Sequence, residues 1–400
     1  MAKLAAGSKR TSHPPKAVQG YKTLGGHNPE TSALHNLLAA QGVVRPDGEK
    51  YSEALLLGIG GGLDFGYFAF ETPRGNHLVL GTRHRWADLT PGFLEGIGTR
   101  LKLDLDVKET TNDRGASNLL VNVVRTQGRA AICWVDLASL PWHFLPPELK
   151  KYVVHAVAVF GLDEDAAVAL VDDRAQGPFL VGVEELGDAR AAIPGLKNRL
   201  LSVNEVVSKP DLKAAILEGI ALMVEANRNP ANKSFGLAGI EKWSELVASP
   251  KDKKGWPSLF APGPGLVEAA VAGYNWLELM SGGGALRPLY AQFLDEAAVL
   301  AKKPKLAKVA EEYRKIAVLW SDFAQALLPE EVTRFKYLRE ALNKKHKAIA
   351  QGAASMSDAE KATKEVASTR KTAGDRPFTD AEAKAYYAGL RARLKVLFEA

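Results

Sequence analysis

The sequence contains a single cysteine, and this scarcity excludes several kinds of protein. With only Cys133 in 400 residues, the chain forms no intramolecular disulfide, which indicates a reducing, cytoplasmic compartment. No apolar run approaches the roughly 20 residues that a membrane helix needs, so we expect no membrane partner. No His-Glu-x-x-His or paired Cys/His spacing is present, so we expect no protein-built metal site and no cofactor. Cys133 lies in an apolar run that predicts a buried strand with an inert thiol.

Acidic side chains are missing from the first 24 residues, which carry five basic ones. The segment also lacks the apolar core of a secretory signal, so residues 1–19 are interpreted as a mobile basic arm. The net charge of +6 is modest for 400 residues, and 20 of the 52 Lys and Arg residues lie in the two tails, 1–24 and 329–400. This distribution favours solvated ends over a nucleic-acid groove, and it leaves a homo-oligomer open.

The stretch from Gly25 to Gly42 predicts a short loop that leads directly into a helix. Asn28 is a strong helix-capping residue, and Pro29 suits the first helical position. Three leucines then recur at helical spacing before Gly42 ends the segment. The start of a helix carries free N–H groups and partial positive charge, so it can hold a thiolate, an oxyanion or a phosphate. The same pattern is also typical of an ordinary amphipathic helix.

Residues 52–70 predict a short helix, a glycine cluster and an aromatic strand. The cluster Gly60-Gly61-Gly62 is neither a GxGxxG motif after a strand nor a Walker loop, because no Lys-Ser or Lys-Thr follows it. Glycine lets the backbone approach a ligand or another backbone closely. We therefore expect a tight turn that lines a pocket, and not a nucleotide site.

Pattern and composition divide the chain into an α+β part and a helical part. Short strands and helices alternate between residues 75 and 142, as in α/β or α+β domains. From about residue 205 the pattern predicts helices over 212–227, 235–248, 265–280, 289–302 and 305–327. We therefore expect an α+β domain over 20–204, a helical domain over 205–328 and a charged helical extension over 329–400.

Residues 153–173 predict two antiparallel strands joined by a tight turn. Side chains alternate along each strand, so His155 and Asp172 meet if the register places them on the same face. The register is not fixed by sequence, and Asp173 is the alternative partner. His155 also fits a core histidine bonded to backbone. A histidine oriented by an aspartate and faced by the start of a helix is the arrangement of papain-like cysteine enzymes.

Several segments together resemble the N-terminal domain of the butirosin-biosynthesis protein H family. They are 27–34, 52–63, 135–141 and 155–161 with Asp172. Residues 281–294, Ser-Gly-Gly-Gly-Ala-Leu-Arg-Pro-Leu-Tyr-Ala-Gln-Phe-Leu, are similar to the domain of unknown function, DUF4872-like, that commonly follows it. The resemblance spans roughly residues 20–327. It implies a papain-like or peptidase-C39-like fold.

The resemblance also implies a chemistry. The family's named member moves an acyl group from an acyl carrier protein onto the amine of an aminoglycoside. A cysteine at the start of the first helix carries the acyl group as a thioester, and a histidine and an aspartate complete the triad. Here His155 and Asp172 match those two positions.

The nucleophilic cysteine of that pattern is absent from this sequence. Alignment on residues 30–34 puts Pro29 at its position, and alignment on His27 puts Asn28 there. Neither side chain can form a thioester. The hydroxyl of Thr31 lies within the first helical turn, but an unactivated hydroxyl is a poor nucleophile at neutral pH.

We interpret the chain as a degenerate relative of these acyltransferases, a pseudoenzyme of natural-product metabolism that binds a small molecule, an acyl-thioester or an acyl carrier protein. One alternative is acyl transfer or amide hydrolysis with His155 as general base and no acyl-enzyme. Another is a structural protein that binds a partner through its basic ends. The expected ligand-binding residues are His27, Thr31, Gly60, Gly61, Gly62 and Arg287.

Overall fold

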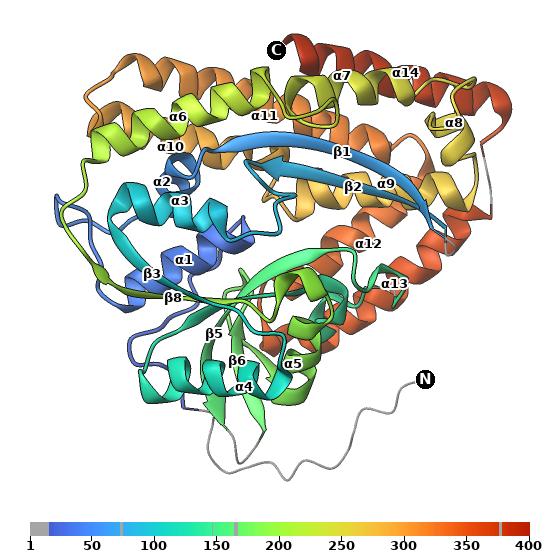
Figure 1. The fold of residues 1–400 in the computed structure, drawn as a ribbon. Coiled ribbons are helices and arrows are strands. Elements are labelled where there is room, and N and C mark those ends of the chain that lie inside the picture. The colour runs from blue at the N-terminus through green and yellow to red at the C-terminus, as the bar shows by residue number, and fades with distance from the viewer. Residues whose placement is uncertain (1–15, 73–74, 146, 164–166, 376–377) are drawn as a thin grey trace. The chain divides into compact units, whose positions relative to one another are not determined.

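The structure, a computed structural model, describes residues 16–72, 75–145, 147–163, 167–375 and 378–400. The described residues form two compact units (Figure 1). Unit 1 contains those within 1–51, 102–208 and 349–356. Unit 2 contains those within 52–101, 209–348 and 357–400. No helix in the described ranges is long and apolar enough to cross a membrane.

Unit 1 is built on a six-stranded sheet whose hydrogen-bonded neighbours are all antiparallel. The strands, in spatial order, are β3 (Leu103–Lys108), β8 (Leu200–Val206), β4 (Ala131–Asp136), β5 (Val154–Asp163), β6 (Val168–Asp172) and β7 (Phe179–Gly182). Every residue of β4 is buried, as its run of apolar side chains predicts. The fold class is therefore α+β, and the hairpin predicted over 153–173 is confirmed as β5 and β6.

The longer helices of unit 1 are α1 (Pro29–Ala40), α4 (Asp113–Val121) and α5 (Val183–Ala191). Trp134 of β4 donates a hydrogen bond to Glu30 of α1, so the even-numbered side chains of β4 face α1. Cys133 therefore lies on the other face, where α5 packs against β4. Its thiol is fully buried, and burial raises its pKa, as expected of an inert packing residue.

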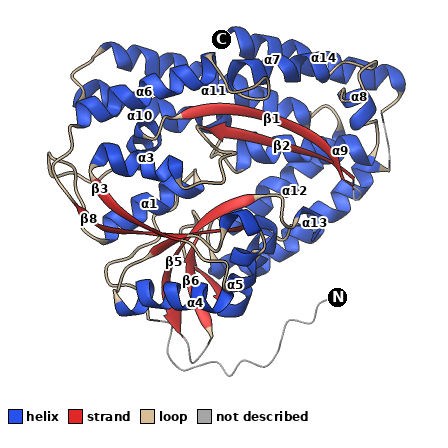
Figure 2. Cartoon of the chain, in the orientation of Figure 1, coloured by secondary structure: helices blue, strands red, loops and turns tan. Residues whose placement is uncertain are grey.

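Unit 2 consists of helices around one β-hairpin (Figure 2). The hairpin strands are β1 (Leu63–Thr72) and β2 (Gly75–Arg83). The helices are α2 (Glu53–Ile59), α3 (Gly92–Leu101), α6 (Leu212–Arg228), α7 (Gly236–Leu246), α8 (Trp256–Leu259), α9 (Pro264–Tyr274), α10 (Arg287–Leu300), α11 (Lys305–Leu327), α12 (Thr333–Ile349), α13 (Met356–Gly374) and α14 (Asp380–Glu399). The predicted helices from 212 to 327 correspond to α6, α7, α9, α10 and α11.

The units differ from the three consecutive domains expected over 20–204, 205–328 and 329–400. Residues 52–101 belong to unit 2, because Phe65 of the hairpin packs into the same core as Trp243 of α7. Leu338 of α12 and Leu394 of α14 also join this core, so the segment expected to be a charged extension supplies interior side chains. A one-dimensional pattern marks apolar faces but does not show which core each face joins.

The expected mobile basic arm falls largely outside the described residues, since the structure describes none of 1–15. Its last residues contact the sheet. The Val18 amide donates a hydrogen bond of 2.7 Å to the Phe160 carbonyl of β5. The ring of Tyr21 stacks on that of Phe160 with 4.3 Å between centroids. Val18, which falls within the expected arm, thus contacts the sheet of unit 1.

Candidate functional site

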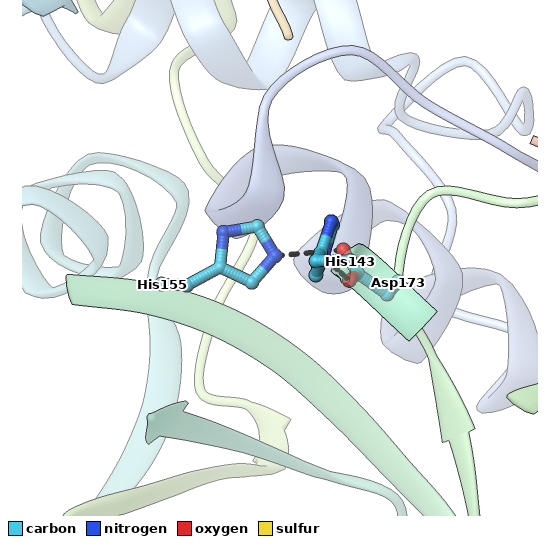
Figure 3. Close-up of side chains that lie close together, drawn as sticks. All are labelled: His143, His155 and Asp173. Carbon is cyan, nitrogen blue, oxygen red and sulfur yellow. Dashed lines mark hydrogen bonds and ion pairs between the residues drawn. The ribbon is translucent and has the colours of Figure 1, made fainter. Parts of the chain in front are cut away.

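The partner of His155 is Asp173. His155 is the second residue of β5, and Asp173 directly follows β6. The distance from His155 Nε2 to Asp173 Oδ1 is 2.7 Å. Figure 3 shows the two side chains facing each other, with His143 beside them. The preferred pairing of His155 with Asp172 was therefore wrong, and the alternative that the sequence left open is the one formed.

A register shift within the hairpin explains this outcome. Near the turn, Gly161 pairs with Leu170, and a continuation of that register would place His155 and Asp172 on the same face. The register shifts by one residue between Gly161 and Val159, so Ala158 pairs with Asp172. Since Ala158 and His155 point to opposite faces, Asp172 points away from His155. The one extra residue in β5 thus turns Asp172 away from the face of His155 and places Asp173 on that face.

The carboxylate of Asp173 accepts hydrogen bonds from four side chains. On Oδ1 they are His155 Nε2 at 2.7 Å and Arg174 Nε at 3.4 Å, and on Oδ2 they are His143 Nε2 at 2.7 Å and Trp142 Nε1 at 2.8 Å. The short turn Pro141–His143 brings two of these donors from outside the sheet. Trp142 is fixed in turn by stacking on Phe179 of β7, 4.5 Å between centroids. Every lone-pair direction of the carboxylate is therefore in use.

The environment of this cluster makes Asp173 an anion and His155 neutral. Burial raises the pKa of Asp173, but the two histidines that donate to its carboxylate hold that pKa well below its usual range. Burial lowers the pKa of His155 to about 4, despite the opposing effect of the Asp173 carboxylate. At neutral pH His155 is thus an uncharged imidazole beside an ionised carboxylate.

The hydrogen bond to Asp173 also fixes the tautomer of His155. A carboxylate only accepts, so Nε2 carries the proton and Nδ1 is left with its lone pair. Figure 3 shows Nδ1 on the edge of the ring turned away from Asp173. Nδ1 makes no hydrogen bond to any residue that the structure describes. It is therefore positioned to accept a proton from a bound molecule.

The same three side chains are the group that could hold a metal ion. The ligand atoms of His143, His155 and Asp173 lie within 4.8 Å of one another, and two imidazoles with one carboxylate suit zinc or iron. However, both Nε2 atoms are already used as donors to the carboxylate at 2.7 Å. These hydrogen bonds satisfy the cluster without an ion.

The start of α1, where the resemblance places a nucleophile, is closed by its own capping residue. The side-chain oxygen of Asn28 accepts from the amides of Glu30 and Thr31 at 3.2 and 3.1 Å. The Thr31 hydroxyl donates to the same oxygen at 3.3 Å, and the Ser32 amide donates to the Asn28 carbonyl at 3.0 Å. Pro29 has no N–H. The first amides of α1 are thus all occupied or missing.

The Arg174 side chain links the start of α1 to the His155 cluster. Arg174 donates from Nε to Asp173 and from Nη1 to the His27 carbonyl at 3.2 Å. His155 itself lies on the opposite face of the sheet from α1, because its neighbour Ala156 pairs with Trp134, which faces α1. The predicted arrangement, in which the start of α1 faces His155, is therefore not formed. The alternation of side chains along β5 turns the imidazole to the face of the sheet opposite α1.

Asp172 belongs to a separate cluster on the α1 face. Its Oδ2 accepts from Asn36 Nδ2 of α1 at 2.6 Å and from the Tyr21 hydroxyl at 2.9 Å. Burial raises the pKa of Asp172 to about 6, and these two hydrogen bonds oppose the rise. The remaining oxygens, Asp172 Oδ1 and Asn36 Oδ1, are buried without a partner. When Asp172 is protonated on Oδ1, its O–H can donate a hydrogen bond, and Oδ1 then no longer needs a donor of its own.

The predicted ligand-binding residues are divided between the units. Thr31 is fully buried in the capping network, and His27 contributes its carbonyl to Arg174. Gly60–Gly62 and Arg287 all lie in unit 2. Sequence reasoning missed Trp142, His143 and Arg174. Trp142 and His143 directly follow the segment 135–141, which carried the resemblance. This position was the one sequence signal that could have pointed to them.

Two family profiles match the chain. The family described as "Butirosin biosynthesis protein H, N-terminal" matches residues 28–174, and the "Domain of unknown function (DUF4872)" matches residues 184–367. The order of the two matches is the one that the sequence resemblance indicated. No curated protein matches the sequence.

Proposed function

For a chain that carries a butirosin biosynthesis protein H N-terminal domain followed by a DUF4872 domain, we propose a role in acyl-group metabolism without a covalent acyl-enzyme. The protein binds an acyl-thioester, a small molecule or an acyl carrier protein on a papain-like unit 1 that has lost its nucleophile. The observation that carries this proposal is the Asn28 cap. Asn28 is, with Pro29, one of the two residues that the resemblance puts at the cysteine position, and its side chain takes up helix amides that could stabilise an oxyanion.

The Thr31 hydroxyl and the one thiol support the same conclusion. Thr31 is fully buried and its hydroxyl donates to Asn28, so the hydroxyl is not exposed to a substrate. Cys133 is fully buried on β4, and burial raises the pKa of its thiol. A thioester intermediate therefore has no suitable acceptor at the start of α1.

A second candidate function rests on the state of His155. A neutral imidazole with its Nε2 proton fixed on Asp173 and a free Nδ1 lone pair is arranged as a general base. An amine would attack the thioester carbonyl, its proton would pass to Nδ1, and the C–S bond would break to release a thiol that recovers the proton. General-base catalysis alone contributes about 10²–10⁴-fold, which is enough for transfer from a reactive thioester.

One experiment separates these functions. The full chain is incubated with an acyl-phosphopantetheine thioester and a panel of amines, and intact mass, product and thioester binding are measured. His155→Ala is the test variant, and His35→Gln is the matched control, because His35 lies on α1 outside the cluster and contacts the Tyr51 carbonyl.

Thioester binding without product or added mass, unchanged in His155→Ala, supports the binding function. Product that disappears in His155→Ala but not in His35→Gln, with no covalent adduct, overturns the binding function in favour of direct transfer. An acyl adduct on the wild-type protein contradicts both.

A further inference from the structure

Arg287, the first residue of α10, is a buried cation without an ion pair. Its side chain is 6% exposed. It donates from Nη1 to the Ala285 carbonyl at 2.7 Å and lies 4.5 Å from the centroid of the Trp320 ring. Across the described residues it makes no salt bridge and no other hydrogen bond. Arginine is rarely buried unless paired, because desolvating the charge is costly.

The turn before Arg287 is held in a left-handed conformation. Gly284, Ala285 and Leu286 have φ angles of 52°, 52° and 68°, a region that disfavours Ala and Leu and is concentrated at functional sites. Leu286 occupies the cap position of α10 and provides no side-chain hydrogen bond. The start of this 14-residue helix is therefore buried and uncapped, and it carries partial positive charge.

Two buried polar atoms near this helix also have no partner. They are the hydroxyl of Tyr290, one turn along α10 from Arg287, and Nδ1 of His84. Tyr290 lies against Gly62 and His84 lies against Gly61, each so closely that a Cβ on the glycine would overlap the ring. The glycine cluster thus brings both unsatisfied groups to one turn of the chain.

No carboxylate in the described residues forms an ion pair with Arg287. Asp64 is close enough to affect the pKa of Arg287, but its Oδ1 accepts from the amides of Phe65 and Gly236, at 2.7 and 3.2 Å. Burial raises the pKa of Asp64 to about 6, so this carboxylate is largely ionised at pH 7, but it forms no ion pair with Arg287.

Two further ionisable side chains face the helix start. Glu278 accepts from the Gly284 amide at 3.2 Å and supports the turn. The Tyr313 phenol lies near both Arg287 and Tyr290, and it is an uncharged neighbour at neutral pH because burial raises its pKa. Arg287 thus keeps unused donors at the start of α10 and has no carboxylate in an ion pair with it.

We propose that the start of α10 is a binding site for an oxyanion of a small ligand, a carboxylate or a phosphate. Arg287 supplies the charge and unused donors, and the hydroxyl of Tyr290, whose ring packs against Gly62, supplies a further donor. These are the residue types that bind carboxylate and phosphate groups at helix starts. The site lies within unit 2 and does not depend on the function proposed for unit 1.

The test measures the thermal stability and calorimetric binding of the full chain with inorganic phosphate, acetate and chloride at equal ionic strength. Tyr290→Phe removes only the unpartnered hydroxyl, so it keeps the fold and weakens oxyanion binding about tenfold or more. Arg287→Met abolishes binding. Arg314→Gln is the matched control, because Arg314 is an exposed α11 arginine paired with Glu311.

Stabilisation by phosphate or acetate beyond chloride, reduced in Tyr290→Phe and unchanged in Arg314→Gln, supports the site, and the stronger of the two anions identifies the ligand class. Equal effects of all three salts overturn it. Wild-type affinity in Tyr290→Phe also overturns it, and this outcome remains readable if Arg287→Met fails to fold. None of these readouts requires acyl-group chemistry.

Discussion

Asp172 and Asp173 are adjacent in the chain, yet their carboxylates lie on opposite faces of the unit 1 sheet with opposite pKa shifts. Asp172 bonds to Tyr21 and Asn36, and burial raises its pKa to about 6. Asp173 bonds to two histidines, which hold its pKa well below the usual range despite its burial. Replacing each aspartate by asparagine should therefore change the stability of the protein in opposite directions.

Asp172→Asn should stabilise the protein above about pH 4 and give no such gain at lower pH. Because the folded pKa of Asp172 is raised above the unfolded value, its contribution to stability is present at low pH and is lost as pH rises through about 6. The substitution removes the charge but keeps an oxygen for both donors, so the gain at pH 7 is at most about 3 kcal/mol. Urea unfolding from pH 4 to 8 measures this difference. A gain that is equal at pH 4 and pH 8 would contradict the assignment.

Asp173→Asn should destabilise unit 1 by about 3 kcal/mol at neutral pH. The amide that replaces one oxygen faces N–H donors, so at least one buried donor loses its acceptor. Since the folded pKa of Asp173 is lowered, the wild-type advantage is present above about pH 4 and is lost as pH falls through the folded pKa. Urea unfolding monitored through tryptophan fluorescence checks the loss, with Asp172→Asn as the adjacent control. Equal stability of the two variants at pH 7 would show that the four donors do not act together.

Asn28→Ala should cost about 1 kcal/mol, the usual effect of losing a helix cap. The side-chain oxygen of Asn28 satisfies the amides of Glu30 and Thr31, which would otherwise remain buried without acceptors. Asn28→Asp keeps an acceptor and adds favourable charge at the helix start, so it should retain wild-type stability. Chemical unfolding of both variants checks the pair, and a loss in Asn28→Asp as large as in Asn28→Ala would argue against a capping role.

The Cys133 thiol should react with iodoacetamide only through unfolding. It is fully buried on β4, and burial raises its pKa, so the native thiolate population is very small. The labelling rate should rise steeply with urea and follow the unfolding transition of unit 1. Rapid labelling of the native protein, read by intact mass, would contradict the burial. Adding a Cys133→Ser variant verifies that no other group takes the label.

The sequence was informative wherever the structure depends on local pattern. Asn28 and Pro29 predicted the start of α1 correctly, and the α+β part followed by helices was expected from periodicity. His155 was found from its strand, but its partner was not, because a register shift between Val159 and Gly161 depends on packing across the whole hairpin. A single-residue displacement is invisible in a hydrophobic pattern and decides which aspartate meets the histidine.

Contacts between distant segments were the part that pattern could not supply. His143 reaches Asp173 from a short turn outside the sheet, and no spacing rule connects the two positions. The assignment of residues 52–101 to the helical unit was missed for the same reason, since Phe65 meets Trp243 across a long stretch of chain. The unsatisfied Tyr290 hydroxyl became visible only when its surroundings were known.

The interleaving of the two units in the chain has a consequence for biosynthesis. The strands of unit 1 are complete in sequence by Val206, whereas the β1–β2 hairpin must wait for α14, whose Leu397 belongs to the same core. At typical translation rates the ribosome takes roughly 15 to 60 s to add the intervening residues. During that interval the aromatic side chains of β1 lack the part of their core that α14 supplies. A chaperone that binds nascent apolar segments has its longest opportunity here, early in the chain and long before the tail is made.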